Sequence, residues 1–447
     1  MPRPLRRALL GAAAGVVVAS RLAVPTPAYA AGERLKPEWC ALDSKVQELA
    51  AAPKGPSWVT ERLRPDRVWE QVDAKNRRIR GAGVRVAVID TGAQLGVSPM
   101  LTPPALATGQ SNEELPKFDL VNYVGDTADL EKRGGGMDCG HATAVVGYIN
   151  GQSFGAWNFT GMAPGAQVTV MRALGRGQGN ETQAAMVQAV LAATDQGFDI
   201  INISQSGGDD PGLKAAIARA VAAGVVVVAA TGNAGPGAGP SYPAAYPGVI
   251  AVGATTRTDT ASQVSQSDPR MPVTVAAPGD DVPLLMPTLK RPAGMSDADY
   301  ERLGIAVSSG QGTSYAAPIV TGVVALMIQK ERAVGVRLAP AEVRRRLELT
   351  ADRPAGAVPD PQLGYGTVNP VNAVFGPFPV ARAPQSSAPA TPAPAPLEVP
   401  APRDLRPVVI AVGVGSAALL ALAGGVVISE ALPAMRRRRY HPARPDE

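Results

Sequence analysis

The serine of the segment Gly-Thr-Ser-Tyr-Ala-Ala-Pro at residues 312–318 is the first candidate for chemistry in this sequence. Ser314 follows a glycine-rich turn and precedes the apolar run from Ile319 to Ile328, so we expect it at the start of a helix. Free N–H groups and the positive end of the helix dipole would favour an anion there. Taken alone, the segment is also compatible with a serine that only caps the helix.

A nucleophilic serine needs a base within hydrogen-bond reach and a carboxylate that orients the base. The chain has two histidines, and only His141 lies outside the arginine-rich tail, so a Ser/His pair must use it. Asp90 ends the β-branched run that begins at Gly83, which predicts a buried parallel strand with the carboxylate at its carboxyl end. Sites in open α/β sheets gather at such ends. The three residue types therefore predict acyl transfer through a serine.

The elements that would position these residues follow a βαβ succession. Short β-branched runs predict strands at Val84–Ile89, Val168–Met171, Ile200–Ser204, Val225–Ala230, Val249–Val252 and Val273–Ala276. Alanine-rich periodic stretches predict helices at Glu181–Asp195 and Leu213–Ala223. This pattern predicts an α/β fold with a mostly parallel sheet covered by helices on both faces. Two long segments, between Asp90 and His141 and from about Pro283 to Leu303, predict inserted surface loops.

Four segments carry a family resemblance: residues 87–92, 141–143, 229–235 and 312–318 resemble the four signatures of subtilisin-like serine peptidases. The resemblance implies a subtilisin-like fold in which Asp90, His141 and Ser314 form the catalytic triad. It also implies an oxyanion hole made by the side-chain amide of Asn233 and the backbone N–H of Ser314. Without the other three signatures, Asn233 would be an ordinary turn residue.

The same resemblance places an extended peptide substrate along two stretches of backbone, as in strand addition. The expected substrate-binding residues are Ser204, Gln205 and Ser206, and Ala230, Thr231 and Gly232. The sequence departs from the family pattern twice, because Gln205-Ser206 stands where Leu-Gly is usual and Ala142 replaces a glycine after His141. The first departure leaves the specificity pocket open, and the second predicts a different fit behind the histidine.

The ends of the chain predict export and anchoring. The formal net charge of +5 collects in these ends, which removes support for nucleic-acid binding. Residues 1–30 have an arginine-bearing start, a short apolar run and a small-x-small site, so they predict a signal peptide rather than a retained membrane helix. Residues 31–80 hold three of the four tryptophans and are expected to pack, as an extension, on a peptidase domain at 81–376.

The remainder predicts a single membrane span. Residues 377–407 are a Pro/Ala-rich linker, 408–429 an uncharged apolar stretch long enough to cross a bilayer, and 430–447 a basic tail. Since positive charge favours the inner side, we expect a cytoplasmic C-terminus and an extracytoplasmic catalytic domain, in the periplasm or cell envelope.

This order of segments resembles the mycosins, the membrane-anchored peptidases of type VII secretion systems. The resemblance implies that the substrate is a polypeptide, a secreted protein, and that the peptidase associates with the secretion membrane complex. It leaves an alternative in which the protein mainly stabilises that complex and proteolysis is secondary. It also implies that the N-terminal extension stays attached and wraps the domain.

The two cysteines, Cys40 and Cys139, are expected to form a disulfide, because an exported chain with no third thiol favours pairing. Two unrelated buried thiols are the alternative. With His141 they supply too few soft ligands for a zinc site, so we expect no metal. No cofactor is expected either.

Overall fold

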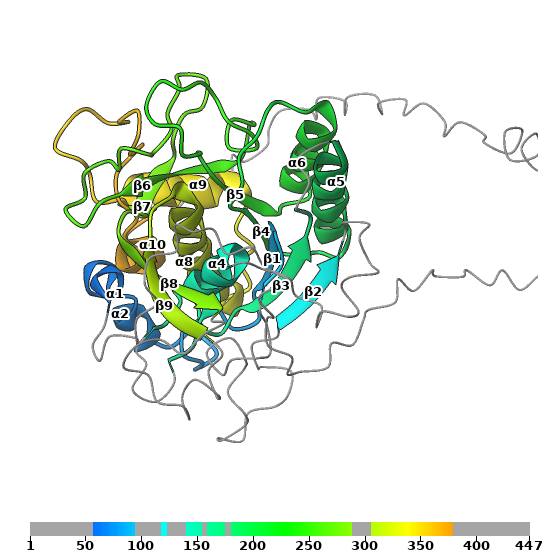
Figure 1. The fold of residues 1–447 in the computed structure, drawn as a ribbon. Helices are drawn as coiled ribbons and strands as arrows, with labels where there is room; N and C mark the ends of the chain where they lie inside the picture. Colours follow the sequence, from blue (N-terminus) through cyan, green and yellow to red (C-terminus); the bar gives the residue numbers. More distant parts are fainter. Residues whose placement is uncertain are drawn as a thin grey trace, which may run out of the picture. The chain divides into compact units, whose positions relative to one another are not determined.

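A seven-stranded parallel sheet forms the centre of the molecule (Figure 1). The computed structural model describes residues 57–93, 118–122, 140–153, 159–174, 180–287 and 305–378. The strands are β1 (Arg85–Asp90), β2 (Phe118–Asn122), β3 (Gln167–Arg172), β4 (Ile200–Ile203), β5 (Val226–Ala230), β6 (Ile250–Thr255) and β7 (Val275–Pro278). Their order is β2-β3-β1-β4-β5-β6-β7, and every neighbouring pair is parallel. The predicted parallel α/β sheet is confirmed, with strand ends shifted by a few residues.

The two faces of the sheet bury alternate residues in two separate apolar cores. Val86 and Val88 of β1 lie in the core that includes α4 (His141–Asn150) and α8 (Thr313–Ala333). Ala87 and Ile89 lie in the core of α5 (Asn180–Asp195) and α6 (Pro211–Ala222) on the opposite face (Figure 1). Because side chains alternate along a strand, a strand buried on both faces reads as an unbroken apolar run. Helices on both faces were predicted, and the two cores confirm them.

Asp90 belongs to the face that carries α4 and α8. It continues the row of Val86 and Val88, so the period of two directs its side chain toward these two helices. The strand order also reverses next to it: from β1 the chain moves to β2 and β3 on one side, and then to β4 on the other. Polar groups at the carboxyl ends of β1 and β4 therefore border the crevice where open α/β sheets bind ligands.

The long helix α8 is apolar on nearly all sides because it is enclosed on nearly all sides. Its residues from Ala316 to Gln329 are buried between the sheet and the segments that cover the helix. Gly322 allows close packing, since a Cβ there would come within 2.5 Å of the Met162 Cβ. Thr321 donates a hydrogen bond of 2.8 Å to Asn202 of β4, which fixes the helix against the sheet.

Both segments that the sequence predicted to be surface loops contain strands. β2 lies in the first, and β8 (Val282–Pro287) begins the second and pairs antiparallel with β9 (Ile305–Gly310). The prediction was therefore wrong in these parts. β8 contains Pro283 and Pro287, which argue against a strand in sequence, but prolines are tolerated on the free edge of a strand. The Tyr148 hydroxyl of α4 donates to the Pro283 carbonyl at 2.5 Å, so the hairpin is held by a contact that no local pattern predicts.

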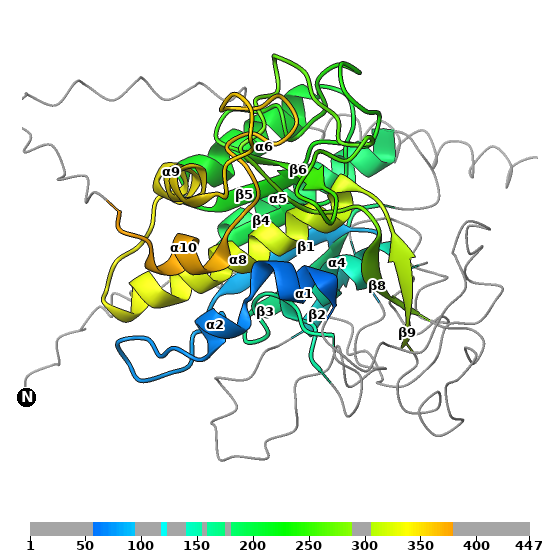
Figure 2. The ribbon, with the colours of Figure 1, turned by 90° about the vertical axis from the view of Figure 1, so that its left-hand side faces the viewer.

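Two short helices precede the sheet and lie alongside α8 (Figure 2). They are α1 (Trp58–Leu63) and α2 (Asp66–Trp69), and their residues Val59, Leu63 and Val68 are buried in the α8 core. The Trp58 indole donates to the Asp281 carbonyl at 2.8 Å and the Trp69 indole to the Met162 carbonyl at 2.9 Å. Residues 57–80, here called the arm, are thus attached both by apolar burial and by long-range hydrogen bonds.

Gln329 of α8 connects the arm to the core. Its side-chain oxygen accepts from three consecutive backbone N–H groups, those of Arg80, Gly81 and Ala82, at 2.8, 2.6 and 2.9 Å. Its nitrogen donates to Asp73 at 3.1 Å and to the Arg78 carbonyl at 2.9 Å. A buried amide is stable when all of its hydrogen bonds are made, as they are here.

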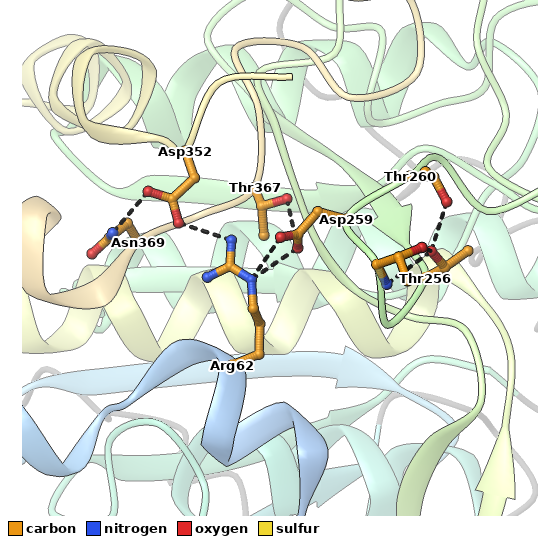
Figure 3. Close-up of polar contacts among 8 residues, drawn as sticks. Arg62, Thr256, Asp259, Thr260, Asp352, Thr367 and Asn369 are labelled. Atoms are coloured by element: carbon orange, nitrogen blue, oxygen red, sulfur yellow. Dashed lines mark hydrogen bonds and ion pairs between the residues drawn. The ribbon is translucent and has the colours of Figure 1, made fainter. Parts of the chain in front are cut away.

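Arg62 connects the arm to the two loops that carry Asp259 and Asp352 (Figure 3). Its guanidinium lies between the carboxylates of Asp259 and Asp352, with nitrogen-to-oxygen distances of 2.8 Å to each. Thr367 and Asn369 hold these two carboxylates from behind. Burial alone would lower the pKa of Arg62, but the hydrogen bonds and charges of the two aspartates raise it. Asp352 follows helix α9 (Pro340–Thr350), and Asn369 precedes helix α10 (Pro370–Phe375), the last helix of the described residues.

Several predicted segments lie outside the described residues. They are the signal peptide, the beginning of the extension, the linker, the apolar stretch 408–429 and the basic tail. Within the described ranges, no helix combines the length and the apolar character that a membrane span requires.

Candidate active site

Asp90 and His141 are in direct contact at the carboxyl edge of the sheet. The Asp90 carboxylate is completely buried, and its Oδ1 lies 2.8 Å from His141 Nδ1. A carboxylate can only accept, so His141 carries its proton on Nδ1, and Nε2 is its acceptor nitrogen. The backbone N–H of Thr91 donates to the same Oδ1 at 2.7 Å. This geometry keeps the imidazole in the tautomer that a general base requires.

His141 is the first residue of α4, where a helix begins directly after Gly140. Gly140 has a φ of 111°, which favours glycine, and it supplies the turn that directs the histidine toward β1. The His141 side chain is 28% exposed, while Ala142 behind it is fully buried in the core. The methyl group of Ala142 therefore contributes to packing behind the histidine. The Tyr315 ring lies 5.9 Å from the imidazole, between ring centroids, and this contact brings α4 and the start of α8 together.

Ser314 is the second residue of α8, and Gly312 occupies the N-cap position without a side-chain hydrogen bond. The serine is thus not the cap of the helix. Its hydroxyl donates to the Ser204 carbonyl at 3.0 Å, at the end of β4. Ser314 precedes Tyr315, whose ring contacts the His141 imidazole, so the starts of α8 and α4 are packed together.

Asn233 lies opposite the start of α8 on the loop after β5. Its Oδ1 accepts from the Thr313 N–H at 2.9 Å and from the Thr313 hydroxyl at 3.0 Å. Since a backbone N–H can only donate, the orientation of the amide is determined, and its NH₂ group is directed away from Thr313. Gly312 leaves room for this amide, because a Cβ there would lie 3.3 Å from Asn233 Nδ2. The exposed amide is thereby available as a donor.

Two residues that the sequence analysis did not single out hold this loop. The Thr313 hydroxyl accepts from the Gly232 N–H at 3.1 Å while it donates to Asn233. The Gln266 backbone N–H donates to the Gly232 carbonyl at 3.0 Å, and its side-chain oxygen accepts from Ala234 at 3.4 Å. The only sequence signal for either residue was the position of Thr313 inside the serine motif.

The expected substrate-binding residues differ in what their backbones can still do. Ala230 pairs with Val252 inside the sheet, and Thr231 donates to the Val252 carbonyl while its own carbonyl accepts from Ser241 at 2.7 Å. The N–H and the carbonyl of Gly232 both make hydrogen bonds within the fold, as described above. Thr231 and Gly232 thus already make backbone hydrogen bonds within the fold, and substrate binding by this stretch stays a prediction.

The other stretch lies at the site itself. Ser204 is buried and contacts Ser314, Gln205 is half-buried, and Ser206 is exposed. The Gln205 side-chain nitrogen lies 3.4 Å from Asp90 Oδ1 and 3.4 Å from His141 Nδ1. The sequence analysis assigned Gln205 to the substrate and not to this pair. Its presence in place of an aliphatic residue was the one available signal.

The remaining predicted positions yield no contact. Cys40 and Cys139 lie outside the described residues, so their pairing stays a prediction. In the described part of the chain, no group of three or more His, Cys, Asp or Glu side chains is arranged to hold a metal ion.

A buried acid, an imidazole and a serine at a helix start, at the switch point of a parallel sheet, define a class of nucleophilic hydrolase that attacks carbonyl groups. The sequence pattern of the subtilase family, peptidase S8, matches residues 81–366. The chain therefore belongs to the subtilase family, and it is a subtilisin-like serine protease.

Among its relatives, Mycosin-4 of Mycobacterium tuberculosis (strain ATCC 25618 / H37Rv) is 34% identical over 378 residues, which are 76% of this chain and 73% of the relative. Thermitase of Thermoactinomyces vulgaris is 32% identical over 62% of this chain and 84% of its own. The solved structure of the MycP3 protease from the type VII (ESX-3) secretion system is 26% identical, with a TM-score of 0.55, over 79% of this chain and 100% of that one. The predicted resemblance to mycosins is thus confirmed.

Proposed function

We propose that Asp90, His141 and Ser314 are the catalytic triad of an endopeptidase that is anchored in the membrane and acts beside a type VII secretion complex. The observation that carries the catalytic part is the 2.8 Å contact between a fully buried Asp90 and His141 Nδ1. A buried carboxylate stabilises the imidazolium that forms when the histidine accepts a proton.

Catalysis begins when the Ser314 hydroxyl leaves the Ser204 carbonyl and donates to Nε2 of His141. The serine oxygen attacks the substrate carbonyl, and His141 then gives its proton to the leaving amine. Water repeats the sequence in reverse and releases the acyl group. The Asn233 amide and the backbone N–H of Ser314 stabilise the oxyanion, because both are donors beside the serine oxygen.

The substrate is a polypeptide bound in an extended conformation along Gln205 and Ser206. Among the described residues, no backbone hydrogen bond within the fold involves Gln205 or Ser206, whereas the Thr231 N–H and the Gly232 carbonyl make such bonds. An extended chain beside Ser206 would have one wall from residues 230–232. Its scissile carbonyl would then lie between Ser314 and Asn233.

The type VII assignment rests on the relatives and the sequence ends. Both the MycP3 structure and the Mycosin-4 similarity cover about three quarters of this chain. The apolar stretch 408–429 and the arginines after it supply the anchor and the orientation, with an extracytoplasmic catalytic domain. A protein that mainly stabilises the secretion complex is the alternative.

The catalytic part is tested with Ser314→Ala in the full-length protein. We expect peptide cleavage to fall by about a million-fold and covalent labelling by a fluorophosphonate probe to disappear, with an unchanged melting temperature. Undiminished turnover would refute the triad. If secretion of type VII substrates continues with the inactive variant and stops on deletion of the whole protein, the structural role is the main one.

The anchor is tested by adding a protease to intact spheroplasts. Cleavage in the linker 377–407 should release a soluble catalytic domain, because an extended proline-rich segment is accessible. Cleavage only after lysis would contradict the orientation.

A further inference from the structure

We propose that Gln205 is a positioning residue of the catalytic centre, which donates to Asp90 and keeps His141 unprotonated at acidic pH. This inference rests on the proposed triad and adds a fourth polar group to it. The starting observation is that one nitrogen, Gln205 Nε2, lies 3.4 Å from both Asp90 Oδ1 and His141 Nδ1.

The orientation of the Gln205 amide follows from its partners. Asp90 can only accept, so the side-chain nitrogen of Gln205 faces the carboxylate, and its oxygen is directed away. The hydrogen bond of His141 uses the same oxygen at 2.8 Å, as does the Thr91 N–H at 2.7 Å. Three donors therefore converge on Oδ1, whereas Oδ2 is buried and has no hydrogen-bond partner in the described structure.

The position of Gln205 in the chain couples it to the nucleophile. Its neighbour Ser204 accepts the Ser314 hydrogen bond at 3.0 Å, and the Ser204 hydroxyl accepts from Asn202 at 3.0 Å. The end of β4 thus contacts the serine through a carbonyl and the Asp90–His141 pair through a side chain. An aliphatic residue at this position could fill the same space but could not donate.

The electrostatic effect has a definite sign. A donor to Asp90 stabilises the carboxylate and spreads its charge, so the carboxylate stabilises an imidazolium less. The partial positive charge of the Gln205 NH₂ group also lies beside His141 Nδ1. Both effects favour the neutral imidazole, which is the form that accepts a proton from Ser314.

Other charged groups near the pair do not replace this contact. Arg172, at the register position opposite Asp90 on β3, donates through Nε to the Thr91 carbonyl at 3.2 Å. Tyr315 of α8 meets the imidazole through its ring at 5.9 Å. After β4, Asp210 accepts from the Leu213 N–H at 2.6 Å and caps α6. Within the described residues, Gln205 is the side-chain amide that contacts both members of the pair.

The test compares two variants of Gln205 with a matched variant elsewhere. Gln205→Met keeps the length of the side chain and removes the donor, and Gln205→Glu replaces the donor by a negative charge. Gln311→Met is the control, because Gln311 is an exposed glutamine near the same site whose amide contacts Ser262 at 3.4 Å. The full-length protein is assayed for kcat/KM on a peptide between about pH 4 and 9.

We expect the acidic limb of kcat/KM to move to higher pH by about half a unit to one unit in Gln205→Met, and further in Gln205→Glu. The control should keep the wild-type limb. Melting temperatures verify that the variants are folded.

Two results would overturn the inference. An unmoved acidic limb in both Gln205 variants would show that the amide does not act on the pair. A change confined to KM would show that Gln205 contacts only substrate. Neither result would affect the triad, which fails only if Ser314→Ala stays active, so the two proposals are tested separately.

Discussion

Two buried aspartates of this protein are stabilised in opposite ways. Asp73 in the arm has donors on both oxygens: the N–H groups of Lys75 and Arg77 on Oδ1, and the side chains of Arg77 and Gln329 on Oδ2. Asp90 in the site receives its donors on Oδ1 alone, and Oδ2 is buried without a partner in the described structure.

The same contrast holds for two amides. Gln329 is buried and makes five hydrogen bonds. Asn233 is exposed, and its bonds to Thr313 use only the oxygen. Side chains whose hydrogen bonds are all made stabilise the folded arm. Side chains with hydrogen-bonding atoms left over in the site can stabilise charge that develops during the reaction. The predictions below test this division, from the largest effect to the smallest.

Asp90→Asn should lower kcat by about 10⁴-fold. The amide has no charge to stabilise the imidazolium, and its NH₂ group favours the tautomer of His141 that carries its proton on the wrong nitrogen. The melting temperature should change little, since one oxygen of Asp90 is already unpaired. Steady-state kinetics and a thermal melt measure both quantities. A variant that keeps its turnover but unfolds would place Asp90 with Asp73 as a structural acid.

Asn233→Ala should lower kcat by about 100- to 1000-fold, the range known for removal of such a donor in subtilisin, and should leave KM nearly unchanged. Gln329→Leu is the matched amide in the arm. It should unfold the protein more readily by about 3 kcal/mol or more, because three backbone N–H groups lose their acceptor. Equal losses of stability in the two variants would remove the contrast between the amides.

Asp73→Asn should reduce the free energy of unfolding by about 2 to 3 kcal/mol at neutral pH, because an amide cannot accept all of these donors. Burial would raise the pKa of Asp73, but the hydrogen bonds from Arg77, Gln329 and Lys75 outweigh it and lower the pKa below its ordinary value of 3.8. A depressed pKa contributes stability above the unfolded value that is lost as pH falls through the folded one. The difference between wild type and variant should therefore shrink below about pH 4 in urea titrations. A difference that is constant with pH would contradict this account.

Arg62→Met should have the smallest effect, about 1 kcal/mol, because the ion pairs with Asp259 and Asp352 are partly exposed. The loss should diminish in high salt. Arg64→Met removes the exposed pair with Asp66 inside the arm and is the control, with little expected change. If both variants lose the same free energy of unfolding, the ion pairs that join Arg62 to the domain stabilise the protein no more than the exposed pair of Arg64 and Asp66 within the arm.

The local sequence predicted much of the sheet and missed particular strands for physical reasons. The runs that became β1 and β5 are apolar on both faces, so burial could be read from composition. β8 contains Pro283 and Pro287 and depends on pairing with β9, about twenty residues further along, which no short window reveals. The strength of the signal thus followed the number of faces buried.

The sequence by itself determined which reactive side chains this protein can use, because a fold can position such groups but cannot supply them. One histidine outside the tail, an acid at a strand end and a serine at a helix start were enough to single out Asp90, His141 and Ser314 as the proposed triad. Only the tertiary structure decided that Gln205 contacts the acid and the imidazole, and that Gln329 binds the arm. Such contacts join residues more than sixty positions apart, and their geometry is set by strand register and helix packing, which exist only in the folded chain.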